Sequence, residues 1–224
     1  MELDFSVLFS NSNFSSIMTG LQVTIYMTLA SLVLSICIGL LIAFGRISKN
    51  KILNILCSVY LAWFRGTPLL VQLMILYYGL AIGLGYGLSA TAAGIIGLGM
   101  YSGAYVSEIA RGAIQSIDGG QMEAGRSLGM GYWQTMIKVI LPQAIRRMLP
   151  PFGNEFIALT KNSSLLSVIT VHELMRAGNL IVSYNFRYFE IYIGIAMIYF
   201  VINFSISKLI EHFERKLSVG GNKA

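Results

Sequence analysis

The stretch from Leu21 to Phe44 contains 24 consecutive residues without a charged side chain. An α-helix needs about 20 predominantly apolar residues to cross a membrane, because each residue rises about 1.5 Å through a hydrocarbon core about 30 Å thick. The rest of the chain has the same character, with 55% hydrophobic and 12% charged residues and a mean hydropathy of +0.69. A soluble domain would need more polar surface. We therefore expect an integral membrane protein.

Further apolar segments predict an all-α membrane protein with five transmembrane helices, in one transmembrane domain over residues 1–224. The spans are expected at about 21–44, 52–84, 89–106, 148–168 and 189–207. Gly66 and Pro68 interrupt the second span and should kink or break it. A break of this kind favours a transport pathway over a passive anchor. Alternatively, span two begins only at Pro68, and residues 52–65 lie at the membrane surface.

Basic residues near the ends of spans predict the orientation, because Lys and Arg are retained on the cytoplasmic side. They gather between spans one and two, between spans three and four, and after span five. Residues 1–20 and 79–89 contain none. We expect the N-terminus outside and the C-terminus in the cytoplasm, with span one too long and too poor in upstream basic residues for a cleaved signal peptide. We interpret the net charge of +6 as part of this topology signal. It also favours contact with membrane lipid, whereas no feature of the sequence indicates binding of nucleic acid.

A polar run from Ser116 to Pro142 separates spans three and four, on the expected cytoplasmic side. It carries apolar side chains that a merely solvated connection would not need, which indicates a contact surface. These are Met122, Leu128, Met130, Tyr132, Trp133, Met136, Ile137, Val139 and Ile140. The alternative is a plain amphipathic loop.

Local signals in this run predict two short helices joined at an angle. Residues 121–128 can form the first helix. Gly129 and Gly131 then permit a sharp turn, because Gly tolerates positive φ. A second helix from about 133 to 140 should be ended by Pro142, which lacks an N–H group. Two such helices would form a rigid knob, and we use the term knob for residues 116–142.

The knob contains Glu123-Ala124-Gly125, a glycine four positions later at 129, and Leu-Pro twelve positions beyond that glycine. This skeleton resembles the cytoplasmic coupling loop of ABC-transporter permeases, in which Glu-Ala-Ala is followed by Gly and by Ile-x-Leu-Pro at the same spacing. Here Gly125 replaces the second Ala, and Val139 stands where Ile is usual. The resemblance implies that the ATPase-coupling residues are Glu123, Ala124, Gly125, Gly129, Leu141 and Pro142.

Three other segments, residues 65–72, 107–112 and 161–165, resemble signatures of permeases for polar amino acids. With the knob included, the resemblance extends over roughly residues 21–217, almost the whole chain. The resemblance implies a multi-pass permease subunit of an ABC importer in the bacterial inner membrane. It also implies three partners: a cytoplasmic dimer of ATPase subunits that binds ATP and Mg, a second permease subunit that is identical or paralogous, and an extracytoplasmic amino-acid-binding protein.

The chain itself has no Gly-x-x-x-x-Gly-Lys-Ser/Thr loop to hold ATP phosphates. We therefore expect it to bind no cofactor and to be no enzyme. Cys37 and Cys57 are expected to be buried apolar residues. His172 and His212 lie 40 residues apart, so no metal site is predicted.

Ionisable residues inside spans usually face a partner or a wet cavity. Glu155 would lie roughly 12 Å into the membrane, and Asn162 is on nearly the same helical face, so both are candidates for the substrate path. A carboxylate there suits a basic amino acid (arginine, lysine or histidine), although this segment is also ordinary for the wider polar amino-acid group. Four further side chains can bind the α-amino and α-carboxyl groups of an amino-acid substrate: Thr67, Gln72, Tyr101 and Ser102. Alternatively, each of them only joins helices by hydrogen bonds.

Buried ion pairs are the competing explanation for these charges. Glu108 and Arg111 have the i, i+3 spacing of a simple helical pair, and we prefer this structural interpretation for Glu108. Glu155 or Glu108 can also pair with Arg65 or Lys161.

Two other classes of function compete with the importer. The first is an ion-driven secondary transporter, although five spans are few and no internal repeat is visible. The second is a membrane scaffold that only recruits a cytoplasmic protein, and it leaves the broken span two without a role. Loss of transport when Glu123 is changed, with assembly preserved, would favour coupling over the scaffold. Uptake in ATP-depleted membranes with an imposed ion gradient would favour the secondary transporter.

Overall fold

The computed structural model describes residues 3–218, and every regular element in that range is helical. The all-α expectation is confirmed. The α-helices are α1 (Asn11–Ile47), α2 (Lys51–Gly66), α3 (Leu69–Met74), α4 (Leu80–Leu84), α5 (Ala90–Gln115), α6 (Gly119–Ser127), α7 (Tyr132–Thr135), α8 (Leu141–Asn162), α9 (Leu174–Asn185) and α10 (Tyr188–Ser218). Short 3-10 helices cover Phe5–Phe9 and Ser163–Ile169, and π-helical turns cover Ile75–Gly79 and Met136–Ile140.

Length and hydropathy identify the helices that can cross a membrane. Within the described residues, α1 and α10 are long and apolar enough by themselves, and two bent pairs also qualify if each pair is one span. These pairs are α2 with Leu69–Leu84, and Tyr132–Ile169 with α9. α5 covers the expected third span, but it does not meet the same hydropathy criterion. The number of spans stays a prediction.

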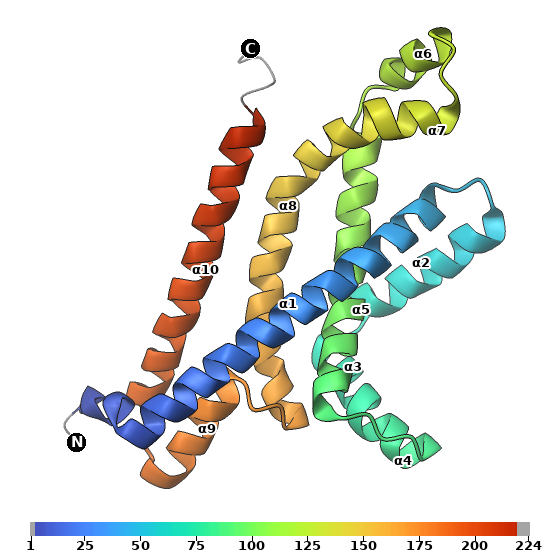
Figure 1. Ribbon diagram of the computed structural model, residues 1–224. Coiled ribbons are helices and arrows are strands. Elements are labelled where there is room, and N and C mark those ends of the chain that lie inside the picture. Colours follow the sequence, from blue (N-terminus) through green and yellow to red (C-terminus); the bar gives the residue numbers. More distant parts are fainter. Residues whose placement is uncertain (1–2, 219–224) are drawn as a thin grey trace.

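The small residues of α5 let it lie at the centre of the bundle. α5 packs against α1 and α8, and Figure 1 shows α1 crossing both helices diagonally. A Cβ atom added to Gly99 would lie 2.7 Å from Leu34 of α1, and one added to Gly103 would lie 3.1 Å from Ile38. Glycines four residues apart thus allow close approach of two helices, as they do in membrane proteins generally.

The break expected in the second span is present. α2 and the segment Leu69–Leu84 are bent by 106° relative to each other. α2 ends at Gly66, and Thr67 has an extended backbone with φ −124° and ψ 149°. The cause is local, because Pro68 disfavours helical geometry in the residue before it.

The predicted end of the second knob helix at Pro142 is wrong. Pro142 lies in the first turn of α8, and the chain stays helical from Tyr132 through the π-helical turn at Met136–Ile140 to Asn162. A proline is tolerated in the first turn because its missing N–H is not needed there, and the π turn shifts the hydrogen-bond register just before it.

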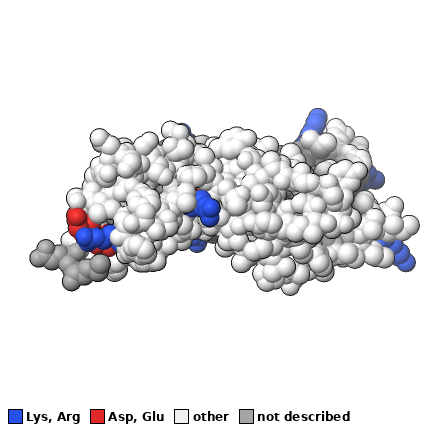
Figure 2. Space-filling view, turned by 90° about the horizontal axis from the view of Figure 1, so that it is seen from below, with Lys and Arg blue, Asp and Glu red and all other residues white. Residues whose placement is uncertain are grey.

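The molecule has two distinct ends. The start of α1, α4 and α9 lie at the bottom of Figure 1, whereas α6, α7 and the end of α10 lie at the top. Figure 2 views the molecule from below and shows a face with few charged side chains. A core cluster that includes Met27, Leu73, Leu98 and Leu166 joins α1, α3 and α5 to the 3-10 segment. Cys57 is buried as expected, but Cys37 is exposed, so the expectation of burial is wrong for Cys37.

Candidate functional site

The knob is built from α6, a tight turn, and α7 with the π-helical turn that follows. Asp118 caps α6 by accepting a hydrogen bond from Gly120 N at 2.7 Å. Gly129 has a φ of +83°, so the glycine signal for the turn is confirmed at this position. Gly131 has a φ of −64°, which any residue can adopt, so the expectation of positive φ there is wrong.

The knob has two arms, α6 and the helical segment from Tyr132 to Ile140, and they meet at Gly125. It is the buried residue of α6, and a Cβ atom added to it would lie 2.5 Å from Cγ2 of Thr135. Thr135 is itself fully buried and donates a hydrogen bond to Gly131 O at 3.1 Å. No side chain fits between the arms at position 125 without displacing Thr135, which accounts for Gly where the family pattern has Ala.

The knob has an apolar interior and an apolar exterior. Its interior packs onto the end of α5 and the start of α8 through a cluster of Ala113, Ile117, Met136, Ile140 and Ala144, with Leu141 packed against it. Its exterior presents Leu128, 83% exposed, and Trp133, 65% exposed. Glu123, Ala124 and Pro142 are also exposed. The knob therefore exposes a carboxylate and apolar side chains on a support that is packed against α5 and α8.

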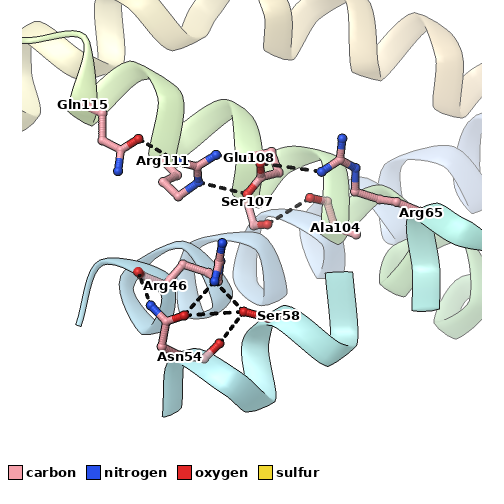
Figure 3. Close-up of polar contacts among 9 residues, drawn as sticks. All are labelled: Arg46, Asn54, Ser58, Arg65, Ala104, Ser107, Glu108, Arg111 and Gln115. Atoms are coloured by element: carbon pink, nitrogen blue, oxygen red, sulfur yellow. Dashed lines mark hydrogen bonds and ion pairs between the residues drawn. The ribbon is translucent and has the colours of Figure 1, made fainter. Parts of the chain in front are cut away.

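A charged cluster joins α2 to α5, as drawn in Figure 3. Glu108 accepts hydrogen bonds from Arg111 Nε at 3.0 Å and Arg111 Nη2 at 2.8 Å. Arg65, at the end of α2, places Nη1 3.5 Å from Glu108 Oε2. Lys161 does not join this cluster, and no carboxylate within residues 3–218 lies at ion-pairing distance from it.

A second polar cluster in Figure 3 closes the turn between α1 and α2. Arg46 Nη1 donates to Asn54 Oδ1 at 2.6 Å and also to Ser58 Oγ, while Asn54 Nδ2 donates to Arg46 O at 2.8 Å. No sequence pattern predicted these contacts. The eight-residue separation of Arg46 and Asn54 across a turn gave no helical signal for them.

Two of the substrate-path candidates meet between α5 and α8. Ser102 is fully buried on α5 and donates its hydroxyl to Glu155 Oε1 at 2.8 Å. Glu155 is half-buried on α8. Asn162, two turns further along α8, is half-buried, and its side chain makes no hydrogen bond to the described residues. Tyr101 pairs with Tyr105 on its own helix, with the two hydroxyl oxygens 3.2 Å apart.

Thr67 and Gln72 meet at the corner between α2 and α3. Gln72 Nε2 donates to Thr67 Oγ1 at 2.7 Å, and to the carbonyl oxygens of Phe64 and Thr67 at 3.2 Å each. The amide therefore satisfies backbone groups that the helix break leaves free. Gln72 Oε1 is buried and has no hydrogen-bond partner among the described residues.

Comparison with known proteins decides the family. Residues 35–219 match the family described as the binding-protein-dependent transport system inner membrane component. The chain belongs to this family. It is 41% identical over 214 residues to a probable amino-acid permease protein, YxeN, of Bacillus subtilis, covering 94% of this chain and 95% of the relative. It is 38% identical over 201 residues to the glutamine transport system permease protein GlnP of Escherichia coli, with 89% and 92% covered.

A solved structure supports the same assignment. The structure, titled as the crystal structure of an amino acid ABC transporter with histidines, superposes with a TM-score of 0.90 at 42% identity, covering 96% of this chain and 100% of that one. The chain is therefore an inner-membrane, helical permease of an amino-acid ABC transporter. As a permease of this family it is not itself catalytic, and the family implies an ATPase partner and a substrate-binding protein.

Proposed function

We propose that this chain is the transmembrane subunit of an ATP-driven importer for polar amino acids, and that the knob couples it to a separate ATPase subunit. The observation that carries the proposal is the combination found in residues 116–142. Glu123 and Leu128 are exposed, while Gly125 and Thr135 lock the two arms together. Exposed apolar groups on a rigidly packed support are what a docking surface that transmits force requires. A flexible loop that only recruits a protein would not need this internal packing.

The five spans of this proposal are α1, the bent segment α2 to α4, α5, α8 and α10. The N-terminus would lie outside, and the C-terminus in the cytoplasm with the knob. Two arrangements support this orientation. The knob and the end of α10 lie at the same end of the molecule in Figure 1, and the opposite face in Figure 2 carries few charges.

The assembly would contain this permease, a second permease that is identical or paralogous, and two ATPase subunits that bind ATP and Mg. An extracytoplasmic binding protein would deliver the amino acid. ATP and the loaded binding protein would each favour one of two conformations, so that the knob moves with the ATPase and reorients the bundle.

The substrate would be a polar amino acid, and we favour a basic one. Glu155 supplies a half-buried carboxylate for a side-chain cation, held in position by Ser102. Gln72 Oε1 is an acceptor without a partner among the described residues, which suits an α-ammonium group. The names of the relatives point to glutamine in one case and histidine in another. The choice of a basic substrate therefore rests on Glu155.

The test is to co-express the chain with its candidate ATPase and to measure copurification and ATP-dependent uptake for the parent and for Glu123→Arg. Glu214→Arg is the matched control, because Glu214 is a carboxylate near the same end of the molecule but outside the knob. We expect copurification and uptake to be lost in Glu123→Arg and retained in Glu214→Arg.

Stable parent protein with no ATPase bound would contradict the proposal. Uptake in ATP-depleted vesicles with an imposed ion gradient would favour a secondary transporter. A membrane protein that binds the ATPase but supports no uptake would favour a scaffold.

A further inference from the structure

A large cleft separates the knob from the turn between α1 and α2. Its volume is about 1010 Å³. One wall comes from the end of α1 and the start of α2, and the other comes from α6, α7 and the π-helical turn. The lining residues used below are Leu41, Phe44, Lys49, Arg126, Tyr132 and Trp133.

Two cations face this cleft from opposite walls. Lys49 lies after the end of α1, and Arg126 lies in the last turn of α6. Both are exposed, and neither has an ion-pair partner within residues 3–218. Arg46, nearby, is different because Asn54 and Ser58 engage it. No Asp or Glu lines the cleft, so Lys49 and Arg126 present a site for an anion.

The remainder of the cleft is apolar and aromatic. Leu41 is 73% exposed and Phe44 is 38% exposed, on the face of α1 that continues toward the expected hydrocarbon core. Tyr132 and Trp133 lie opposite, with their rings edge to face at 5.5 Å between centroids. Tyr and Trp are typical of the headgroup level of a membrane, where one part of the ring is apolar and the other is wet.

We propose that this cleft binds an anionic phospholipid of the cytoplasmic leaflet. Lys49 and Arg126 hold the phosphodiester, and an acyl chain lies along Leu41 and Phe44. Basic pockets between helices on the cytoplasmic side are suited to anionic lipid headgroups, whereas a free phosphate would leave the apolar walls uncovered. The cytoplasmic position rests on the proposed function. The lipid would contact both α1 and the knob, so it would restrict movement of the docking surface relative to the membrane.

The chain offers its own reporter, because Trp133 lines the cleft and the only other tryptophan is Trp63 on α2. The chain is reconstituted, with and without its candidate ATPase, in phosphatidylcholine vesicles with increasing amounts of phosphatidylglycerol brominated on its acyl chains. The difference in fluorescence quenching between the parent and Trp133→Phe gives the contribution of Trp133. We expect brominated phosphatidylglycerol to quench Trp133 at lower mole fractions than brominated phosphatidylcholine does.

Lys49→Gln and Arg126→Gln should each raise the phosphatidylglycerol fraction needed for half-quenching about fivefold, the effect of one basic contact near an anionic surface. Both side chains are exposed and unpaired within the described residues, so the variants should fold. The matched control is the pair Arg146→Gln and Lys216→Gln, which removes the same charges outside the cleft and should leave the half-quenching fraction unchanged.

Four results would overturn the proposal. The first two are equal quenching by the two lipids and equal effects of the cleft and control variants. The third is loss of the lipid-dependent quenching when the ATPase binds, which would assign the cleft to the ATPase. The fourth is competition by inorganic phosphate alone, which would assign the cleft to a free anion. Failure of ATPase copurification with preserved quenching would reject the proposed function while leaving the lipid site intact.

Discussion

Gly125 packs so closely against Thr135 that an added Cβ atom would lie 2.5 Å from Thr135 Cγ2 and 2.9 Å from Oγ1. This contact joins the first arm of the knob to the second. Both residues are buried, and both arms carry exposed apolar groups beyond the contact. The angle at which the knob presents its outer surface therefore depends on one glycine and one threonine.

The first prediction concerns this contact. Gly125→Ala should force the arms apart and cost about 1–3 kcal/mol, which is typical of overpacking in a dense interior. ATP-dependent uptake and ATPase copurification should both fall. Adding Thr135→Ala removes the atoms that the new methyl group meets and should restore much of the loss. A single variant with full uptake, or a double variant no better than the single, would show that the contact does not set the shape of the knob.

The second prediction concerns substrate charge. Glu155→Gln keeps an oxygen that can accept the hydrogen bond from Ser102, but it removes the negative charge. Arginine uptake should fall about tenfold more than glutamine uptake, because a hydrogen bond to a charged group contributes about 1.5–3 kcal/mol. Competition between the two labelled amino acids measures the ratio. Equal losses for both would reject a role of Glu155 in binding a side-chain cation.

The third prediction separates two roles of Gln72. Gln72→Leu removes the donor to Phe64 O and Thr67 O at the corner of α2 and α3, and it should destabilise the protein by about 1–3 kcal/mol. Thermal unfolding in detergent, with the exposed Gln134→Leu as control, measures this effect. If the melting temperature is unchanged while the KM for uptake rises, Gln72 contacts substrate and does not brace the corner.

The fourth prediction concerns the ion pairs of Glu108. Glu108→Gln leaves Arg65 and Arg111 without their shared carboxylate, and stability should fall by about 1 kcal/mol, because the Glu108 side chain is only 24% exposed and thus partly shielded from solvent. Glu214→Gln is the control, since Glu214 has no ion pair within residues 3–218. Melting temperatures that fall equally in both variants would mean that the cluster adds nothing to stability.

Local patterns predicted the parts of this protein that depend on neighbouring residues. Uncharged runs indicated membrane helices, Gly66 and Pro68 indicated the break, and Gly129 indicated the turn of the knob. The spacing around Glu123 indicated the family. Each of these signals acts within one or two helical turns, because helix propensity, capping and backbone φ are set by residues close in the chain.

Pro142 is a position at which the local pattern predicted the wrong structure. A proline often ends a helix, but here the preceding π-helical turn and packing of the knob onto α5 and α8 keep the chain helical. The positive charge of Lys161 made it a candidate for an ion pair. No carboxylate within residues 3–218 lies at ion-pairing distance from it.

The sequence by itself determined that this is an all-helical membrane permease with a knob between two apolar segments, because composition, periodicity and motif spacing are properties of the chain alone. Only the tertiary structure decided that Ser102 meets Glu155, that Arg65 reaches Glu108, that Gly125 packs against Thr135, and that Lys49 and Arg126 face one cleft. These pairs lie 10 to 77 positions apart in the chain. Their meeting depends on how α1, α5 and α8 cross, and packing of small residues on several helices at once fixes that crossing.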